Sequence, residues 1–311
     1  MIRVIAGRLA WMLPNVVVLT FLLFAVVTKW LGSPAAMMLG TDASPQAIAD
    51  MNQRYGFDQP VMQQYIRWVG AAFSGDFGRS YATQQNVASM IAAALPVTLE
   101  LAFWAITLAL LTAIGLNSVT VGRRLIGAAV SSVSVVGVTI PNFMLGAMLI
   151  YVFSVRLGWL PTTGWVPWSE GIGRHLLHLI MPVLTLFTFY FSSFSMIYRT
   201  EYRATERQLY VRVARAKGIS EGLISFRHIL PNAILPVVTY VGISIGHLVG
   251  GAVVTEAVFS IPGLGRLFVS AIAGYDFPVM LAMAMVVLTG VMVANLLADL
   301  LLTGLNPQVR V

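Results

Sequence analysis

The sequence Tyr210-Val-Arg-Val-Ala-Arg-Ala-Lys-Gly218-Ile-Ser220 lies in the only strongly charged stretch of the chain, residues 200–231, between two long apolar runs. Apolar residues recur at helical spacing before Gly218, and glycine often follows the last residue of a helix because it accepts a left-handed backbone. Ser220 can then cap the start of a second helix. This stretch therefore predicts a helix–turn–helix inserted into an otherwise apolar chain.

The two helices of this charged segment are expected at residues 205–217 and 221–229, and Pro231 opens the apolar run that follows. One face of the first helix is apolar and carries Leu209, Val213 and Ala216. The small residues Ala214 and Gly218 would let the surface of another protein approach closely. Two interpretations remain open, namely a docking surface for a partner and a solvated basic loop that only determines membrane topology.

The composition requires a membrane environment. Of the 311 residues, 58% are hydrophobic and only 10% are charged, whereas soluble domains have roughly 25% charged residues. A water-soluble fold could not cover so much apolar surface, so the bilayer must act as solvent. The net charge of +7 could indicate a nucleic-acid partner, but the basic residues cluster beside apolar runs, as membrane topology requires. The absence of cysteine excludes disulfides, thiol chemistry and cysteine-bound metals.

Hydropathy predicts an all-α integral membrane protein with six transmembrane helices, each able to cross about 30 Å of hydrocarbon. They span residues 9–31, 95–118, 126–154, 178–199, 232–256 and 279–303. The first has the basic start of a signal peptide but no convincing cleavage site, so we expect it to remain uncleaved. One side of the membrane collects most of the basic residues: Arg3, Arg8, Arg123, Arg124, Arg199, Arg203, Arg207, Arg212, Arg215, Lys217, Arg227 and Arg310. By the positive-inside rule, both termini are cytoplasmic.

Three parts of the chain are expected. They are the N-terminus with the first transmembrane helix (1–31), an extracytoplasmic cap between the first two helices (32–94), and a transmembrane core (95–311) that includes the charged segment. The cap should contain one or two helices, one of them running from Pro60 to Ala72. Pro141 should kink the third span and free backbone groups at membrane depth, either for packing alone or to line a pore. Glycines at every fourth position of the fifth span should allow close helix packing: Gly242, Gly246 and Gly250.

The motifs that would support catalysis or metal binding are weak. Gly242-Ile-Ser244-Ile-Gly246 matches the nucleophile-elbow pattern but lies in an apolar span without a preceding strand, so it indicates helix packing. His175 and His178 have the spacing of a metal pair but lack an evident third ligand, which favours interfacial histidines and no metal. A phosphate-binding loop requires a Gly-Lys step, and neither of the two lysines follows a glycine. ATP hydrolysis by this chain is therefore not expected.

Four ionisable residues lie at or near membrane depth, where a charge costs at least roughly 2.5–3.5 kcal/mol: Glu100, His247, Glu256 and Asp299. Such groups face a cavity or a partner, so each is either a polar contact between helices or a contact to substrate or gate. The carboxylates also permit an alternative function, an ion-coupled secondary carrier. That class predicts inverted internal repeats, and none is evident in the sequence.

The charged segment also resembles a known family. Val213-Ala214-x3-Gly218 followed by Leu230-Pro231 is similar to the EAA loop of permease subunits in binding-protein-dependent ABC importers, although Arg212 replaces its glutamate. Arg212-x-Ala214-Arg215-Ala216-Lys217-Gly218 is closest to the dipeptide/oligopeptide/nickel branch. Further similarities, in order along nearly the whole chain, are Asp58-Gln-Pro60, Gly75-Asp76-Phe77-Gly78-x-Ser80, Pro96-x-Thr98-Leu99-Glu100-Leu101, Ile140-Pro141-x-Phe143, Gly251-x3-Thr255-Glu256-x2-Phe259, Pro262-Gly263-Leu264-Gly265, Asn295-x3-Asp299-Leu300 and Pro307-x-Val309-Arg310.

This resemblance implies a non-catalytic permease in the cytoplasmic (inner) membrane of a bacterium or archaeon, forming half of a translocation path for peptides or similar small polar solutes. Its implied partners are a second homologous permease, two cytosolic ATPase subunits that bind ATP and Mg, and an extracytoplasmic solute-binding protein. The helix around 212–222 would couple ATPase closure to alternating access. The ATPase contacts expected are Arg212, Ala214, Lys217, Gly218, Ser220, Leu230 and Pro231. The expected residues of the path or gate are Glu100, Pro141, Asn142, His247 and Glu256.

Overall fold

The computed structural model describes residues 2–30, 34–40, 43–120 and 123–305. In this part of the chain, helices are joined by turns, and the only β-structure is an isolated bridge between Arg79 and Asn86. The chain divides into two compact units, which are considered separately. The first contains Met1–Val97 and Pro262–Met292, and the second contains Thr98–Ile261 and Val293–Val311.

The first unit is built from α1 (Ile2–Trp30), α2 (Pro34–Leu39), α3 (Pro45–Tyr55), α4 (Val61–Phe73), the start of α5 (Val87–Thr120), α13 (Leu264–Ala273) and the first part of α14 (Phe277–Leu305). Its core joins α1, α4 and α5 to α13 and α14 through buried apolar residues that include Phe24, Tyr65, Ile91, Leu264 and Phe277. The hydroxyl of Tyr65 lies 2.8 Å from that of Thr20, which ties α4 to α1. The helix expected from Pro60 to Ala72 is confirmed as α4.

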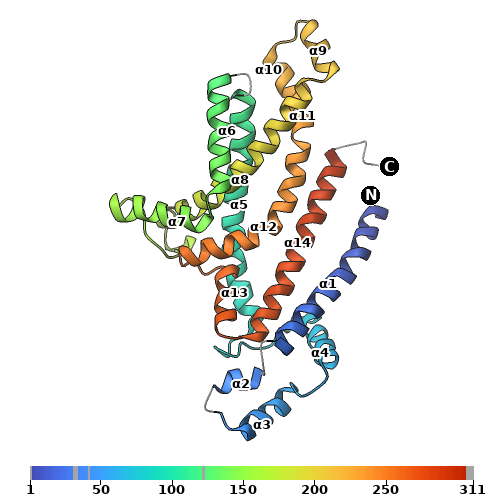
Figure 1. Cartoon of the computed structure of the whole chain (residues 1–311), viewed down its shortest axis with the longest axis vertical. Coiled ribbons are helices and arrows are strands. Elements are labelled where there is room, and N and C mark those ends of the chain that lie inside the picture. Colours follow the sequence, from blue (N-terminus) through green and yellow to red (C-terminus); the bar gives the residue numbers. More distant parts are fainter. Residues whose placement is uncertain (1, 31–33, 41–42, 121–122, 306–311) are drawn as a thin grey trace. The chain divides into compact units, whose positions relative to one another are not determined.

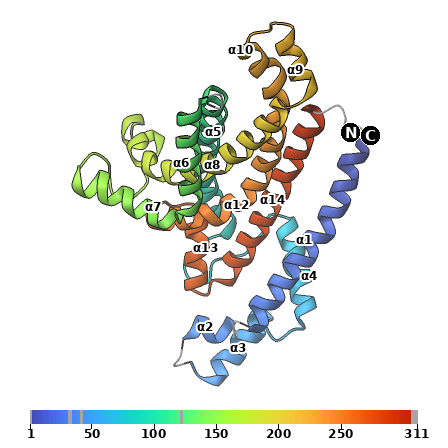
Figure 2. The same cartoon turned by 45° about the horizontal axis from the view of Figure 1, so that its top comes forward.

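The second unit contains the remainder of α5 and α14, together with α6 (Arg124–Thr139), α7 (Asn142–Leu149), the π-helix η1 (Ile150–Arg156), the 3-10 turn η2 (Trp168–Glu170), α8 (Ile172–Glu206), α9 (Leu209–Ala216), α10 (Glu221–Ile224), the π-helix η3 (Ser225–Ile229), α11 (Leu230–Ala233) and α12 (Leu235–Val258). The 35-residue helix α8 is its central element, and α6, α7, α11 and α12 all contact it. Figures 1 and 2 both show α9 and α10 beyond the end of α8, beside α11.

Close approach of helices is possible where glycine faces a neighbouring helix. A Cβ atom added to Gly137 of α6 would lie 2.2 Å from the Ser192 hydroxyl oxygen of α8. One added to Gly242 of α12 would lie 2.2 Å from the Ala298 Cβ of α14. The packing role expected for Gly242 is thus confirmed, whereas Gly246 and Gly250 lie outside the residues whose surroundings are described. Small residues at such contacts replace the hydrophobic drive that lipid cannot supply.

Three described helices are long and apolar enough to cross a membrane: Val87–Thr120, Ile172–Glu206 and Phe277–Ala298. Two bent pairs raise the number to five if each pair is one span, and Pro14–Thr28 forms a shorter apolar helix. The expectation of an all-helical membrane protein is therefore confirmed. The number of six helices and their orientation stay predictions.

The bends alter two of the expected spans. The third is broken at Pro141, where the axes of Leu125–Thr139 and Asn142–Arg156 differ by 104°, far more than a proline kink alone. Ile140 is extended, as the residue before a proline prefers, so the helix ends and a new one begins. The fifth span begins only at Leu235, because the chain turns by 43° between Glu221–Ala233 and Leu235–Ser244.

Candidate functional site

The charged segment forms a compact helical hairpin, α9 and α10, at residues 209–224. The expected first helix, 205–217, was placed too early, because α8 continues to Glu206 and α9 begins only at Leu209. Gly218 ends α9 as expected and has a φ of +76°, a left-handed conformation that favours glycine. Ser220 has the extended backbone of an N-cap, but its side chain makes no capping hydrogen bond. The expected second helix is present as α10 continued by η3.

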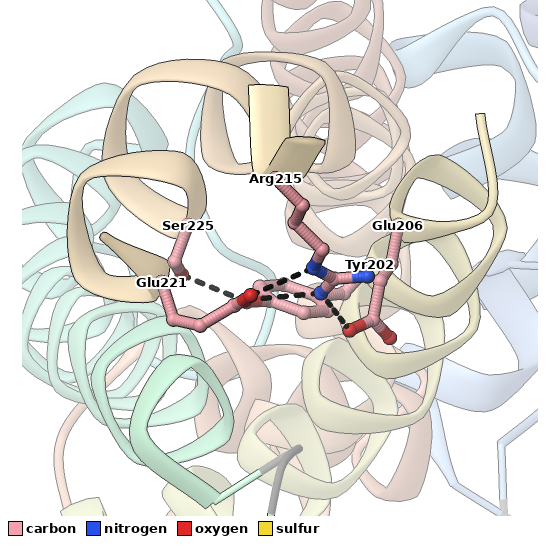
Figure 3. Close-up of polar contacts among 5 residues, drawn as sticks. All are labelled: Tyr202, Glu206, Arg215, Glu221 and Ser225. Carbon is pink, nitrogen blue, oxygen red and sulfur yellow. Dashed lines mark hydrogen bonds and ion pairs between the residues drawn. The ribbon is translucent and has the colours of Figure 1, made fainter. Parts of the chain in front are cut away.

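Arg215 links both helices of the hairpin to α8 (Figure 3). Its guanidinium donates two hydrogen bonds to the Glu221 carboxylate, at 2.7 and 3.0 Å, and a third of 2.8 Å to Glu206 at the end of α8. The Glu221 pair is bidentate, the arrangement that matches the planar guanidinium best. This arginine therefore holds the start of α10, the end of α9 and the end of α8 in one arrangement.

The charges of this cluster stabilise one another. Hydrogen bonds from Arg215 lower the pKa of the Glu221 carboxyl, and the same bonds with those to Glu206 raise the pKa of the guanidinium. The side chains of Arg215 and Glu206 are about one-third exposed, and that of Glu221 is 68% exposed. Solvent weakens such pairs, so the network contributes on the order of 1 kcal/mol to the free energy of unfolding. Its main effect is on the shape of the hairpin.

Two tyrosines add further anchors to the hairpin. The buried Tyr202 of α8 donates a 2.8 Å hydrogen bond to the Ser225 hydroxyl at the start of η3 (Figure 3). Tyr210 of α9 donates a 3.4 Å bond to the His228 carbonyl, and Asn232 donates to both of these oxygens. Sequence reasoning missed the two tyrosine contacts, because the partner of Tyr202 lies 23 positions away and that of Tyr210 lies 18 positions away.

The hairpin and the start of η3 that follows it carry both buried and exposed apolar side chains. Val211, Ala214 and Ile224 are at most 5% exposed. By contrast, four larger apolar side chains are between 44% and 75% exposed: Leu209, Val213, Leu223 and Phe226. The face that carries Leu209 and Val213 therefore has no covering within this chain's described residues, although its apolar character favours burial.

The residues expected to contact an ATPase fall on both faces. Ala214 is buried in the hairpin, where its small side chain serves internal packing, and Leu230 is half-buried. The others are exposed: Arg212, Lys217, Gly218, Ser220 and Pro231. A side chain at Gly218 would meet open space, with no atom within 4 Å of an added Cβ.

A second polar cluster joins α5 to α8 within the second unit. The Glu100 carboxylate accepts a 2.9 Å hydrogen bond from the Trp168 indole and lies 3.0 Å from His175 Nε2. The other ring nitrogen of His175 is 2.6 Å from the Val166 carbonyl, which can only accept, so Nδ1 carries a proton. Trp168 stacks on the histidine ring at 3.8 Å between centroids.

Glu256 of α12 is fully buried and accepts a 2.6 Å hydrogen bond from the Thr98 hydroxyl of α5. A carboxyl group without solvent needs such partners, because burying it unpaired costs several kcal/mol. Glu100 and Glu256 therefore both connect α5 to another helix of the second unit. They do not meet in one site through any contact that the structure describes.

The remaining candidates for the path lie at the broken span. Pro141 is the N-cap of α7 and Asn142 is its first residue. The Asn142 side-chain nitrogen would lie 3.3 Å from a Cβ added to Gly251, so this break faces α12. The side chains of His247 and Asp299 lie outside the described residues.

The motifs weighed for metal binding and catalysis can be placed in the structure. Among them, no three His, Asp or Glu residues are grouped as metal ligands. His175 is buried while His178 is half-buried and bonds the Arg174 carbonyl, so the two histidines are in different environments. Ser244 of the apparent nucleophile elbow lies within helix α12, and the strand that such an elbow requires is missing there.

Long apolar helices, a charged hairpin held by hydrogen bonds and exposed apolar side chains on that hairpin are the main features of this membrane protein. The comparisons with known proteins specify its class. Residues 105–311 match the family "Binding-protein-dependent transport system inner membrane component", and residues 1–102 match "Binding-prot-dependent transport system membrane comp, N-term".

Curated relatives match over the whole length. The "Glutathione transport system permease protein GsiC" of Salmonella paratyphi A and that of Escherichia coli strain K12 are each 35% identical over 314 residues, covering 100% of this chain and 99% of theirs. Among solved structures, a "Crystal structure of an amino acid ABC transporter with histidines" matches 69% of this chain and 94% of its own, with a TM-score of 0.53. At 19% identity, that likeness shows the fold alone.

The chain belongs to the family of binding-protein-dependent transport system inner membrane components. It is thus a permease of an ABC importer of the dipeptide/oligopeptide branch in the inner membrane, and its system includes a solute-binding protein and ATPase partners. This membership decides against the ion-coupled carrier.

Proposed function

We propose that this chain is one of two similar permease subunits in an importer that moves peptide-like solutes by ATP-driven alternating access. In this proposal the chain crosses the membrane six times with both termini in the cytoplasm, and residues 32–94 form an extracytoplasmic cap. Two cytosolic ATPase subunits bind ATP and Mg, and a solute-binding protein delivers the cargo. Closure of the ATPases would move packed helices as rigid bodies between two discrete arrangements.

The observation that carries this proposal is the construction of the α9–α10 hairpin. A surface that transmits movement must keep its own shape and must also bind its partner. The Arg215 network and the Tyr202–Ser225 bond hold the hairpin in one arrangement. The exposed Leu209, Val213 and Phe226 supply an apolar surface that a groove on an ATPase would bury. Arg212, Lys217 and Ser220 then flank this surface as polar contacts.

For the cargo, we propose short peptides or peptide-like compounds, with glutathione as the first to test. The support comes from the two curated permeases that match end to end, which are named for glutathione transport. For the path we propose Glu100, Pro141, Asn142, His247 and Glu256. Pro141 and Asn142 would act as a hinge at the 104° break. If Glu256→Gln left transport rate and substrate preference unchanged, Glu256 would be removed from this set.

The coupling role is tested by placing a charge on the exposed apolar face. We expect Leu209→Arg or Phe226→Arg to reduce uptake at least about tenfold, because burying an unpaired charge at an interface costs more than 1.4 kcal/mol. The matched control is Leu125→Arg, which adds the same charge at a side chain that is 85% exposed at the start of α6. Uptake in proteoliposomes and co-purification of the ATPase subunits are measured together.

Gly218 provides a second test. Gly218→Trp places a bulky group into open space at the tip of the hairpin and strains its left-handed backbone. We expect the variant to insert into the membrane yet fail to couple ATP hydrolysis to uptake. Normal uptake by Leu209→Arg, Phe226→Arg and Gly218→Trp would refute the proposed coupling surface.

A further inference from the structure

A polar cavity in the second unit has no role in the mechanism above. It has a volume of about 230 Å³ and lies among α5, α6 and α8. Its polar lining consists of Asn117, Ser131, Ser134, Ser195, Arg199 and Arg203, with Thr200 at the same end of α8. Two arginines line it, and no carboxylate does.

Arg199 is the central group of this cavity. It is 8% exposed, and its best contact with another side chain is a long 3.5 Å hydrogen bond to the Asn117 side-chain oxygen. Its Nε atom is buried and makes no hydrogen bond within the described residues. The hydroxyl of Ser195, on the same helix and 1% exposed, is also buried without a partner there. Buried donors are rarely left in this state, because each costs about 1–3 kcal/mol and charged ones cost more.

The chemistry of these buried donors indicates which kind of ligand would satisfy their hydrogen bonds. A buried guanidinium without a counter-charge calls for an anion, and its fork of N–H donors fits a phosphate or carboxylate edge. The serine hydroxyls add donors from other directions, which suits a tetrahedral oxyanion. Pockets for drug-sized ligands have volumes of roughly 300–1,000 Å³, so 230 Å³ suits an ionic group and not a whole peptide.

The position of the cavity indicates where such a group comes from. The cavity adjoins residue 200, where the charged segment begins, and this end of α8 is cytoplasmic in the proposed topology. The apolar side chains Val135 and Met196 also line it and are 54% and 45% exposed, as expected where acyl chains reach the protein. The inner leaflet carries anionic phospholipids at this depth.

We propose that this cavity binds a phosphate group, carried by the headgroup of an anionic phospholipid or present as free phosphate. Arg199 holds the phosphate oxygens, Ser195 donates to them, and Arg203 contributes positive charge at the mouth. Occupation would satisfy the donors at the junction of α6 and α8, two to three turns before the end of α8 that carries the hairpin.

The test uses the full transporter complex, purified and stripped of lipid in detergent. In one arm it receives anionic phosphatidylglycerol or zwitterionic phosphatidylcholine, whose phosphate is offset by its own choline cation, and lipid retained by the complex is counted by native mass spectrometry. In the other arm it receives inorganic phosphate alone, and the thermal unfolding midpoint is followed. We expect Arg199→Gln and Ser195→Ala to weaken binding of the active probe, the first by about tenfold or more.

Two further variants, Arg199→Lys and Arg207→Gln, serve as controls for charge and for position. Arg199→Lys keeps the positive charge and should retain part of the binding, whereas Arg207→Gln removes an exposed arginine beyond the cavity and should change nothing. Ser195→Ala removes a hydroxyl that has no partner among the described residues, so this variant should fold normally even if Arg199→Gln does not. Dependence on Arg199 and Ser195 in the lipid arm identifies a headgroup, and in the phosphate arm a free anion. Equal binding by wild type, Arg199→Gln and Ser195→Ala in both arms would overturn the proposal.

Discussion

Arg215 in the hairpin and Arg199 in α8 have opposite surroundings. Arg215 is about one-third exposed and could be solvated at little cost, yet it makes three hydrogen bonds to two carboxylates. Arg199 is buried, where an unpaired charge is expensive, yet its only described side-chain contact is a long bond to an amide. The comparison teaches that Arg215 finds its counter-charges within this chain, whereas Arg199, in the proposal above, receives its counter-charge from a bound phosphate group.

The largest expected effect concerns the packing around Arg199. A Cβ atom at Gly127 of α6 would lie 2.5 Å from the Arg199 guanidinium and 2.9 Å from the Thr120 backbone oxygen. We expect Gly127→Val to destabilise the protein by about 3 kcal/mol, because the backbone atom cannot move aside. Thermal unfolding of the purified complex measures this. Gly115→Val on α5, where an added Cβ meets nothing within 4 Å, is the control, and equal losses in both would remove this explanation.

The next effect concerns a buried carboxyl group that does have a partner. Thr98→Val removes the hydroxyl that donates to Glu256. We expect the free energy of unfolding to fall by about 1–3 kcal/mol, because the acceptor stays buried. Thr98→Ser keeps the donor and should lose much less. The difference in unfolding midpoint between the two variants measures the hydrogen bond, and no difference would contradict a role for it.

A smaller effect is expected from the exposed network. Arg215→Met should lower the free energy of local unfolding of the hairpin by about 1 kcal/mol, since solvent competes for both carboxylates. Hydrogen exchange of residues 209–224 should accelerate while the global unfolding midpoint hardly changes. Glu221→Gln should have more effect than Glu206→Gln, because Glu221 receives two of the three hydrogen bonds. A global loss of stability in Arg215→Met would show that the hairpin is not a separate local element.

The smallest effect is a pH dependence of the same network. Arg215 lowers the pKa of Glu221 below its ordinary value of 4.5. A lowered pKa means that the stabilisation is complete above the ordinary value and is lost as the pH falls through the lowered one. A spin label attached at position 223 should therefore show low mobility at neutral pH and increased mobility only below pH 4.5. The Glu221→Gln variant should show no such transition.

Local chemistry made parts of this site predictable. The turn at Gly218 and Ser220, an interruption of some kind at Pro141 and the membrane environment follow from residue types and short-range spacing, although the sequence predicted only a kink at Pro141. The boundaries of α8 and α9 did not follow, since the sequence 200–208 is compatible with either helix. The 104° angle at Pro141 was also beyond sequence reasoning, because a proline ends a helix without choosing the direction of the next one.

Composition, periodicity and motif order are properties of the chain alone, and they suffice to predict a helical membrane protein with a charged helix–turn–helix that resembles ABC importer permeases. The folded structure was needed to learn which face of α9 is covered, that Arg215 meets Glu206 as well as Glu221, and that Arg199 lines a cavity without a carboxylate among its lining residues. The physical reason is that burial and counter-charge depend on neighbours from other helices, and a helical period gives a face without saying what lies opposite.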